Sequence, residues 1–304
     1  MLSQPAGGPR PDLRSLRAIG WPRGPRAGMV AGMGEPDRAA ITDIYTYAGM
    51  PDGAEELIAS SRAPRPRSML LELAGELDAG PGTVVLDAGC RDGRFGVPLV
   101  RRYGCRVVGV DLVARGFAAG RAAAAAAGVA ERIAFVRSDA TALPLGAGAV
   151  DLVWCRDMIE HQADPAAMLR ECRRVLRPGG RMLLHAVYAT DLLEPRERGR
   201  MFAALSLSAV AMDRAALETA ISGAGFTIAH ADRLAGESIE YDLEHDPDRV
   251  ISSLLAVGRL TRDPEGYQAA LGPVWYERLL GFEQWRLFLL LGKLDTFVYQ
   301  LTAG

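Results

Sequence analysis

The stretch that most constrains this chain runs from Val84 to Gly96 and reads VVLDAGCRDGRFG. It opens with a short β-branched and apolar run, which is typical of a buried strand, and the residues from Phe95 onward predict a helix. A strand, a glycine-bearing turn and a helix start bring backbone N–H groups close to a ligand. Asp87 at the end of the strand would repel a pyrophosphate. The pattern therefore favours a ligand with a positive group, such as an ammonium or a sulfonium.

The alternation of strand and helix continues along the chain. A second apolar run ends in an acid, Asp111, and the interval after Asp87 accommodates one turn and one crossover helix. Strands that alternate with helices imply a parallel sheet with helices on both faces. In such sheets an acid at the end of the second strand accepts hydrogen bonds from ribose hydroxyls, and a helix N-cap is the alternative role for Asp111. Further strands are expected at 132–140, 150–155, 181–187 and 226–231.

The composition is that of a globular chain with a sizeable core. Of 304 residues, 49% are hydrophobic and 24% are charged, and the formal net charge of −2 provides no general attraction to nucleic acid or to an acidic membrane. No apolar run is long enough to span a bilayer. The four cysteines form no CxxC pair and have no metal-ligand spacing with histidine. We therefore expect reduced, mostly buried thiols, no metal site and a cytoplasmic location.

The sequence divides into four parts. The first part, residues 1–40, is rich in Gly, Pro and Arg, which predicts a disordered extension or sequence upstream of the true start. The third part, residues 235–295, contains Asp246-Pro247 and Asp263-Pro264, two pairs that are typical of helix starts. The expected parts are an extension at 1–40, a core with N-terminal lid helices at 41–234, a helical insertion at 235–295 and a final strand at 296–304.

Five motifs stand in the order and spacing of the class I S-adenosylmethionine-dependent methyltransferases, and the chain resembles the small-molecule members of this family over roughly residues 68–232 and the final strand. The resemblance implies an α/β, doubly wound, mostly parallel seven-stranded sheet, the Rossmann-like methyltransferase fold, with a helical cap inserted before the last strand. A nicotinamide fingerprint fits less well, because G-x-G-x-x-G is not satisfied from Gly89 onward. The motifs are Asp87–Gly93, Gly109–Asp111, Ser138–Ala140, Asp151–Cys155 and Leu176–Gly180.

The resemblance also implies where S-adenosylmethionine would bind. The loop after the first strand would hold the methionine part, Asp111 the ribose hydroxyls, and Asp139 with Ala140 the adenine edge, while the backbone near Arg156 would meet the ammonium. The family often has glycine where this chain has Arg91, and a non-glycine residue suits that turn only if φ stays negative. The predicted cofactor-binding residues are Asp87, Gly89, Cys90, Gly93, Asp111, Leu112, Asp139, Ala140 and Arg156.

Methyl transfer of this kind is a direct displacement at carbon, so the protein must place a nucleophile in line and exclude water. Where the nucleophile is a hydroxyl or an activated carbon, a base helps to remove its proton. The catalytic candidates are Glu160 and His161, just past the fourth strand. His161 is equally well explained as a structural histidine, and Glu160 as a solvated acid at a helix start. Asp157 and His185 are further candidates, with loop capping favoured for Asp157.

The insertion would shape the acceptor site. Its aromatic and aliphatic residues between Trp275 and Phe288 either pack a small core of their own or line an apolar pocket above the cofactor, and both can hold at once. We also expect Tyr45 or Tyr47 to fold over the cofactor. The predicted partner is an apolar small molecule, with neither nucleic acid nor membrane, and a homodimer is left open.

The predicted activity is methyl transfer to an apolar secondary metabolite. O-methylation is favoured over C-methylation of a terpenoid, a quinone or another activated carbon. Two other classes stay open: a methyltransferase-fold protein that binds the cofactor without methyl transfer, as a cyclase or scaffold, and a methyltransferase that acts on RNA or protein.

Overall fold

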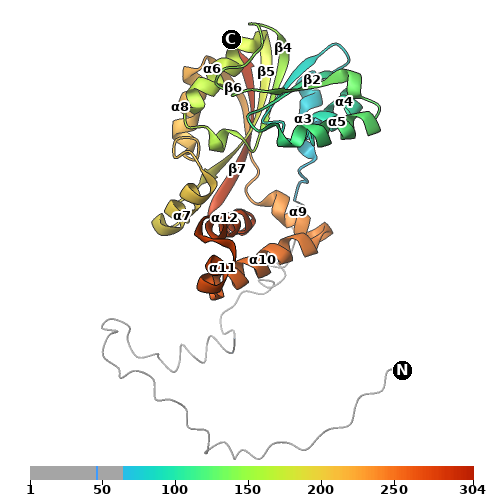
Figure 1. Ribbon diagram of the computed structural model, residues 1–304. Coiled ribbons are helices and arrows are strands. Elements are labelled where there is room, and N and C mark those ends of the chain that lie inside the picture. Colours follow the sequence, from blue (N-terminus) through green and yellow to red (C-terminus); the bar gives the residue numbers. More distant parts are fainter. Residues whose placement is uncertain (1–45, 47–63) are drawn as a thin grey trace, which may run out of the picture. The chain divides into compact units, whose positions relative to one another are not determined.

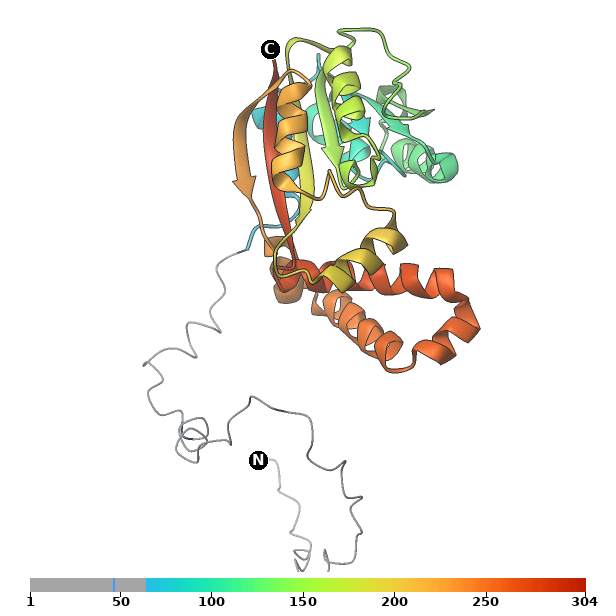
Figure 2. The ribbon, with the colours of Figure 1, turned by 90° about the vertical axis from the view of Figure 1, so that its left-hand side faces the viewer.

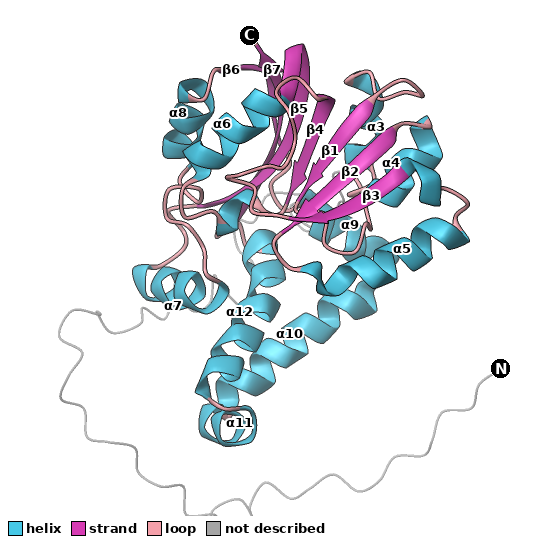
Figure 3. Cartoon of the chain, turned by 45° about the horizontal axis from the view of Figure 1, so that its top comes forward, coloured by secondary structure: helices cyan, strands magenta, loops and turns pink. Residues whose placement is uncertain are grey.

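A seven-stranded sheet forms the centre of the computed structural model, which describes Thr46 and residues 64–304. The strand order is β3-β2-β1-β4-β5-β7-β6 (Figure 3). The β7 strand is antiparallel to both of its neighbours, and the other pairs are parallel. This sheet confirms the predicted fold class. The strands are β1 Val84–Ala88, β2 Arg106–Asp111, β3 Ile133–Arg137, β4 Val150–Arg156, β5 Leu176–Ala189, β6 Phe226–Arg233 and β7 Leu294–Ala303.

Helices cover both faces of the sheet because successive strand residues point to opposite sides. On one face Leu86 and Val153 pack with side chains of α6 and α8, and on the other Val85 and Trp154 pack with side chains of α3 and α4. Figure 1 shows the two groups of helices on either side of the strands. The helices of the core are α3 Met69–Glu76, α4 Gly96–Tyr103, α5 Phe117–Ala126, α6 Pro165–Val175, α7 Pro195–Leu205 and α8 Arg214–Gly223.

Two helix starts in the core follow from capping chemistry that the sequence displays. The Asp164 carboxylate accepts the Ala167 N–H at 2.9 Å at the start of α6, where Pro165 occupies the first turn and lacks the N–H that would otherwise need a partner. The Asp213 carboxylate accepts the Ala216 N–H at 2.8 Å and starts α8 in the same way. These caps fix where the chain turns back onto the sheet.

The predicted helical insertion lies between β6 and β7. Figure 2 shows these orange and red helices extending past one end of the sheet. Tyr276 and Leu280 pack against Leu260 in a small core of their own, whereas Phe288 and Leu289 pack against residues of α7 and β7. The final strand begins at Leu294, two residues before its predicted start. The helices of the insertion are α9 Glu237–His245, α10 Pro247–Arg262, α11 Pro264–Leu271 and α12 Pro273–Leu290.

Some predictions fall outside the described residues. These are the extension at 1–40 and the expected contact of Tyr45 or Tyr47 with the cofactor. None of the described helices is both long and apolar enough to cross a membrane. All four cysteines are free and buried, as expected.

The first prediction concerns the core under the sheet. Replacing Leu86, which is fully buried in β1, by alanine should lower the free energy of unfolding by about 2–5 kcal/mol, because the cavity left behind cannot collapse completely. Urea denaturation followed by circular dichroism measures this change. The control is Leu192→Ala, which removes a side chain that is 62% exposed and should shift stability by less than about 0.5 kcal/mol. Equal effects of the two substitutions would contradict the assigned core.

Candidate active site

The loop after β1 is tied to the neighbouring strand by its backbone. The N–H groups of Gly89 and Cys90 both donate to the carbonyl of Val110 in β2, at 2.8 and 3.1 Å. Gly89 has a φ of 83°, and a Cβ there would lie 2.6 Å from Cγ of Met158. Gly93 has a φ of 71°. The two glycines therefore permit a turn that most other residues would strain.

Arg91 corrects one expectation from the sequence. Its φ is 51°, which lies in the left-handed region, whereas a negative φ was expected for a non-glycine residue at this turn. Its N–H donates to Oδ2 of Asp111 at 2.8 Å. A Cβ atom at Gly116 would lie only 2.6 Å from the carbonyl oxygen of Arg91. The hydrogen bond to a charged acceptor offsets the strain of the positive φ.

The predicted acidic residues gather at the carboxyl ends of adjacent parallel strands. Asp111 ends β2, and its Oδ1 accepts the Val113 N–H at 2.8 Å. Asp139 lies just past β3, where the backbone N–H and the hydroxyl of Thr141 both donate to Oδ1 and lower the pKa of Asp139. Nearby, Leu112 is 60% exposed and Ala140 is buried. The structure thus brings these predicted residues to one edge of the sheet, as the parallel topology requires.

Asp87 differs from the other acids because it lies beneath the loop. It is 1% exposed, and its Oδ2 accepts no hydrogen bond within the described part of the chain. Burial raises the pKa of Asp87 to about 7, and a hydrogen bond from the Gly96 backbone acts in the opposite direction. Cys90 packs nearby, and burial also raises the pKa of its thiol. Asp87 is therefore placed to act on the loop and its surroundings through charge rather than by facing an open cavity.

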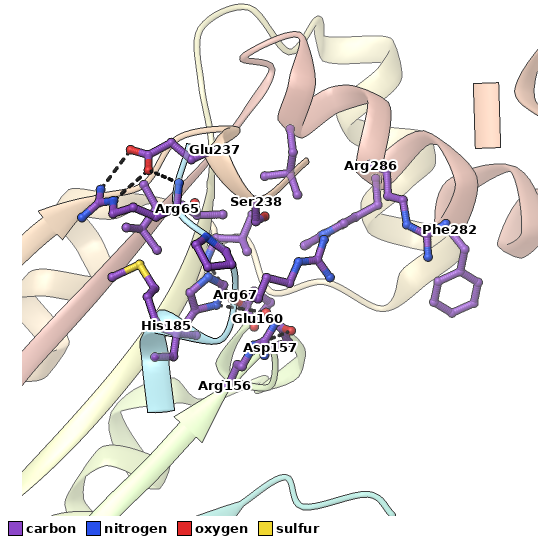
Figure 4. A pocket seen from close by; sticks show the side chains of 18 of the residues that line it. Arg65, Arg67, Arg156, Asp157, Glu160, His185, Glu237, Ser238, Phe282 and Arg286 are labelled. Atoms are coloured by element: carbon purple, nitrogen blue, oxygen red, sulfur yellow. Dashed lines mark hydrogen bonds and ion pairs between the residues drawn. The ribbon is translucent and has the colours of Figure 1, made fainter. Parts of the chain in front are cut away.

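A cavity of about 350 Å³ lies beside this loop, between the ends of β4 and β5 and the inserted helices. Its lining includes Arg91 and Arg156 from the strand ends, and Phe282 and Trp285 from α12. Figure 4 shows Arg156, Asp157 and Glu160 on one side of this space and Phe282 with Arg286 on another. The aromatic residues of the insertion therefore serve in two ways: some pack a separate core, and others line the cavity. Its wall is charged as well as apolar.

Asp157 connects two basic side chains at the base of the cavity. Its Oδ1 lies 3.0 Å from Nδ1 of His185 on β5, and its Oδ2 lies 3.2 Å from Nε of Arg156. Desolvation acts to raise the pKa of Asp157, but the interactions with His185 and Arg156 outweigh it and hold that pKa well below its usual range. The Arg156 guanidinium also stacks over the Phe95 ring at 4.3 Å. The His185 ring is 8% exposed and lines the cavity, and its Nδ1, although close to Asp157, has no partner with hydrogen-bond geometry among the described residues.

Both catalytic candidates from the sequence line the same cavity. Glu160 is 1% exposed, so its interpretation as a solvated acid is wrong. Its Oε1 accepts the Val187 N–H at 2.7 Å, while its Oε2 has no hydrogen-bond partner among the described residues. Burial, followed by the negative charge of Asp157, raises the pKa of Glu160 to about 8. His161, in contrast, is exposed.

Sequence reasoning missed the pairing of Asp157 with His185. The available signal was that Asp157 follows β4 and His185 lies near the end of the next strand, since Arg156 is opposite His185 in the sheet. Within residue 46 and residues 64–304, no three His, Cys, Asp or Glu side chains form a group that could hold a metal ion. The polar residues at this edge thus offer charge, hydrogen-bonding groups and an imidazole next to a carboxylate.

The fold and the acids at this edge agree with the arrangement expected for a methyltransferase, and known proteins with similar sequences include methyltransferases. Residues 86–184 match the family described as "Methyltransferase domain". Methyltransferase GfsG from Streptomyces halstedii is 30% identical over 157 residues, which cover 52% of this chain and 55% of that protein. The ubiquinone biosynthesis O-methyltransferase of Sodalis glossinidius is 39% identical over 113 residues, covering 36% of this chain and 43% of that protein.

Solved structures share the fold at lower identity. The geranyl diphosphate C-methyltransferase of Streptomyces coelicolor A3(2) superposes with a TM-score of 0.57 at 18% identity, covering 78% of each chain. The [4+2]-cyclase SpnF gives a TM-score of 0.59 at 19% identity, covering 77% of this chain and 80% of that chain. This chain thus contains a methyltransferase domain over residues 86–184, and solved structures of the same fold hold S-adenosyl-L-homocysteine or S-adenosylmethionine. It spans about half the length of the curated relatives described above.

The residues at the carboxyl edge fit this cofactor. The glycines at 89 and 93 allow the positive φ values of the loop and leave room for the side chains of Met158 and Phe135, which pack against them. A buried carboxylate oxygen of Asp87 without a partner complements a positively charged ligand, because such a ligand would favour the ionised form. Asp111 and Asp139 provide charged acceptors for hydroxyl and amino groups.

Glu160 leads to a prediction about pH. Because its pKa is raised from 4.5 to about 8, the folded state binds more protons than the unfolded state between these values. Stability should therefore fall as pH rises across this window, by up to about 1.4 kcal/mol per pH unit from this group. Glu160→Gln should remove this contribution, so the variant becomes progressively more stable relative to the parent from pH 5 to about pH 8.

Chemical denaturation across the pH range measures this difference. Glu265→Gln, which alters an exposed residue at the start of α11, is the control and should keep the slope of the parent. A constant stability difference between the parent and Glu160→Gln across the range would show that Glu160 ionises normally in the folded protein.

Proposed function

We propose that this protein transfers a methyl group from S-adenosylmethionine to a hydroxyl of a small molecule with a large apolar part. The observation that carries the proposal is the His185–Asp157 pair, which faces a cavity that also reaches Arg91 of the loop. An oriented base and the edge predicted to bind the cofactor therefore share one space. C-methylation of an activated carbon is the alternative, since it needs the same base.

In this proposal the cofactor lies along the carboxyl edge of β1, β2 and β3. The backbone of Gly89, Cys90 and Gly93 surrounds its methionine part, and Asp87 stabilises the positive charge from beneath the loop. Asp111 and Leu112 bind the ribose and Asp139 with Ala140 the adenine, while the main chain at Arg156 receives the ammonium. The bound cofactor supplies a methyl group that its sulfonium makes electrophilic.

His185 is the base in this proposal. An imidazole whose Nδ1 is held by a carboxylate has its other nitrogen available to accept a proton, provided Nδ1 carries the hydrogen. Asp157, whose Oδ1 lies 3.0 Å from Nδ1, favours that tautomer by its negative charge and stabilises the positive charge that develops on the ring. Glu160, protonated below about pH 8, can donate a hydrogen bond from its free oxygen into the same cavity. His161 stays the second candidate base.

The acceptor would occupy the part of the cavity lined by the insertion. Met69, Leu70, Phe282, Trp285 and Leu289 provide its apolar contacts. The names of several relatives favour O-methylation: a tocopherol O-methyltransferase and the ubiquinone biosynthesis O-methyltransferases both resemble this chain. These names also support a role in secondary or cofactor metabolism. We further propose a cytoplasmic location, on the basis of the four free cysteines.

The proposal is tested by offering methyl-labelled S-adenosylmethionine with a panel of hydroxylated quinones, chromanols and macrolides. Mass spectrometry with fragmentation distinguishes a methyl group on oxygen from one on carbon. A labelled O-methyl product is the expected result. Tight cofactor binding without methylation of any acceptor would favour a cyclase or scaffold role. Failure to bind the cofactor would overturn the proposal.

The cofactor site gives a direct prediction. Asp111→Ala and Asp139→Ala should each weaken binding of S-adenosylhomocysteine by about 10- to 100-fold, because each removes hydrogen bonds to a charged acceptor. Isothermal titration calorimetry measures this change. Asp191→Ala, an exposed acid after β5, is the control and should bind like the parent. Parent-like affinity in both Asp111 and Asp139 variants would refute the site assignment.

The base gives a second prediction. His185→Gln should reduce kcat by about 100-fold or more while leaving the affinity for S-adenosylhomocysteine within about twofold, because general-base catalysis typically contributes 10²–10⁴. Asp157→Asn should reduce kcat less and displace the acid limb of the pH–rate profile. Initial rates with the identified acceptor, measured across the pH range, give the kcat and the pH–rate profile of each variant.

Two histidine variants complete this test. His230→Gln changes an exposed residue of β6 and should retain full activity. His161→Gln compares the second candidate directly. A greater loss of kcat in His161→Gln than in His185→Gln would move the base to His161.

A further inference from the structure

The cavity contains more positive charge than a purely apolar acceptor requires. Carboxylates also line the cavity, and they neutralise some of its guanidinium groups but not all of them. The arginines that line it are Arg65, Arg67, Arg91, Arg156 and Arg286.

Two of these arginines lie close to carboxylates of the cavity wall. Arg65 donates to both carboxylate oxygens of Glu237, at 2.7 and 2.9 Å, and also pairs with Asp232. Nε of Arg156 lies 3.2 Å from Oδ2 of Asp157 without a hydrogen bond within the described residues, and the guanidinium stacks on the Phe95 ring at 4.3 Å. Bidentate and paired guanidinium groups of this kind are structural elements of the wall. They provide little attraction for a further anion.

Arg67 and Arg286 are compensated far less completely. The carboxylate nearest to Arg67 is that of Asp242, with Nη2 and Oδ2 3.7 Å apart, and within the described residues the Arg67 side chain makes no hydrogen bond. Arg286 donates from Nη1 to the neutral hydroxyl of Ser253 at 2.7 Å, and its nearest carboxylate, on Glu283, is 3.9 Å away. The side chains of Arg67 and Arg286 are only 32% and 30% exposed. They are therefore partly desolvated without a close counter-ion.

The neighbourhood of these two arginines reinforces this imbalance. Desolvation is the largest influence on both guanidinium groups and lowers the pKa of each. Asp242 and Asp157 act against it at Arg67, and Glu283 and Asp242 act against it at Arg286, where the charge of Arg67 itself lowers the pKa further. Asp242 is the shared acid of the group, yet its Oδ2 is buried without a hydrogen bond in the part of the chain that the structure describes. The carboxylates nearest to Arg67 and Arg286, on Asp242 and Glu283, lie 3.7 and 3.9 Å away, and neither forms a hydrogen bond with its arginine within the described residues. An anion brought between Arg67 and Arg286 would gain charge-assisted hydrogen bonds that the protein itself leaves unmade.

We propose that the acceptor carries an anionic group, a carboxylate or a phosphate, which Arg67 and Arg286 bind on the side of the cavity formed by the insertion. This inference rests on the proposed function, because it concerns the acceptor of that reaction. The apolar lining by Phe282 and Trp285 would hold the body of the molecule, so the acceptor is amphiphilic. Figure 4 shows Arg286 next to Phe282 and away from Arg156 at the end of β4.

The carboxylate of the cofactor itself is the competing explanation. Arg91 and Arg156 stand at the ends of β1 and β4, beside the loop predicted to hold the methionine part. Arg286 instead lies on α12, and Arg67 precedes α3. The two explanations predict different losses on mutation, since arginines that bind the cofactor must change the affinity for S-adenosylhomocysteine.

The experiment uses the full chain saturated with S-adenosylhomocysteine and two probes, inorganic diphosphate and benzoate, titrated separately by calorimetry. The parent should bind at least one probe, and the preferred probe identifies the group as phosphate or carboxylate. Arg67→Gln and Arg286→Gln should each weaken that binding by at least tenfold, and Arg286→Lys by less. Affinity for S-adenosylhomocysteine should stay within twofold in all three variants.

The control is Arg262→Gln, an exposed residue at the end of α10, which should bind the probe like the parent. Circular dichroism verifies that each variant is folded, and Arg286→Lys keeps the test decisive if a glutamine variant is not. Absence of binding of both probes to the parent would overturn the proposal. So would parent-like binding in the variants, or a parallel loss of S-adenosylhomocysteine affinity. Failure of the parent to bind S-adenosylhomocysteine would instead refute the proposed function.

Discussion

The parallel pairing of β1 with β2 and β4 is the constraint on which the site depends. Parallel neighbours in register end at the same edge, so the loop after β1, the acid that ends β2 and the turn after β4 meet without long connections. The carbonyl of Val110 holds the loop by accepting two N–H groups, from Gly89 and Cys90. Moving the loop would leave buried backbone groups unpaired, at a cost of about 1–3 kcal/mol each. The rigid part of the site is therefore made of main chain.

This part of the site could be predicted from the sequence because its signals are local. A β-branched run, glycines at a turn and an acid at a strand end each depend on a few consecutive residues. The conformation of Arg91 could not be predicted from such a local rule. Its positive φ is stabilised by a hydrogen bond to Asp111, which comes from the next strand. The usual preference of a non-glycine residue for a negative φ is thus overridden by this one tertiary hydrogen bond.

The acceptor side of the cavity was less predictable, because its residues meet only through tertiary structure. His185 reaches Asp157 because Arg156 and His185 are opposite each other in β4 and β5, and a register irregularity between Val150 and Leu152 precedes that pairing. No local pattern specifies this register. The burial of Glu160 likewise depends on distant segments, since Val187 binds its side chain and Ser208 its carbonyl.

The insertion of α9–α12 between β6 and β7 has an evolutionary consequence. Both of its ends enter adjacent antiparallel strands, so the segment can lengthen, shorten or be replaced while the ends stay together. The glycine loop and the acids belong to strands on the opposite half of the sheet. Under the proposed function, changes in this segment would alter which acceptor is recognised while the strands proposed to bind the nucleoside stay as they are.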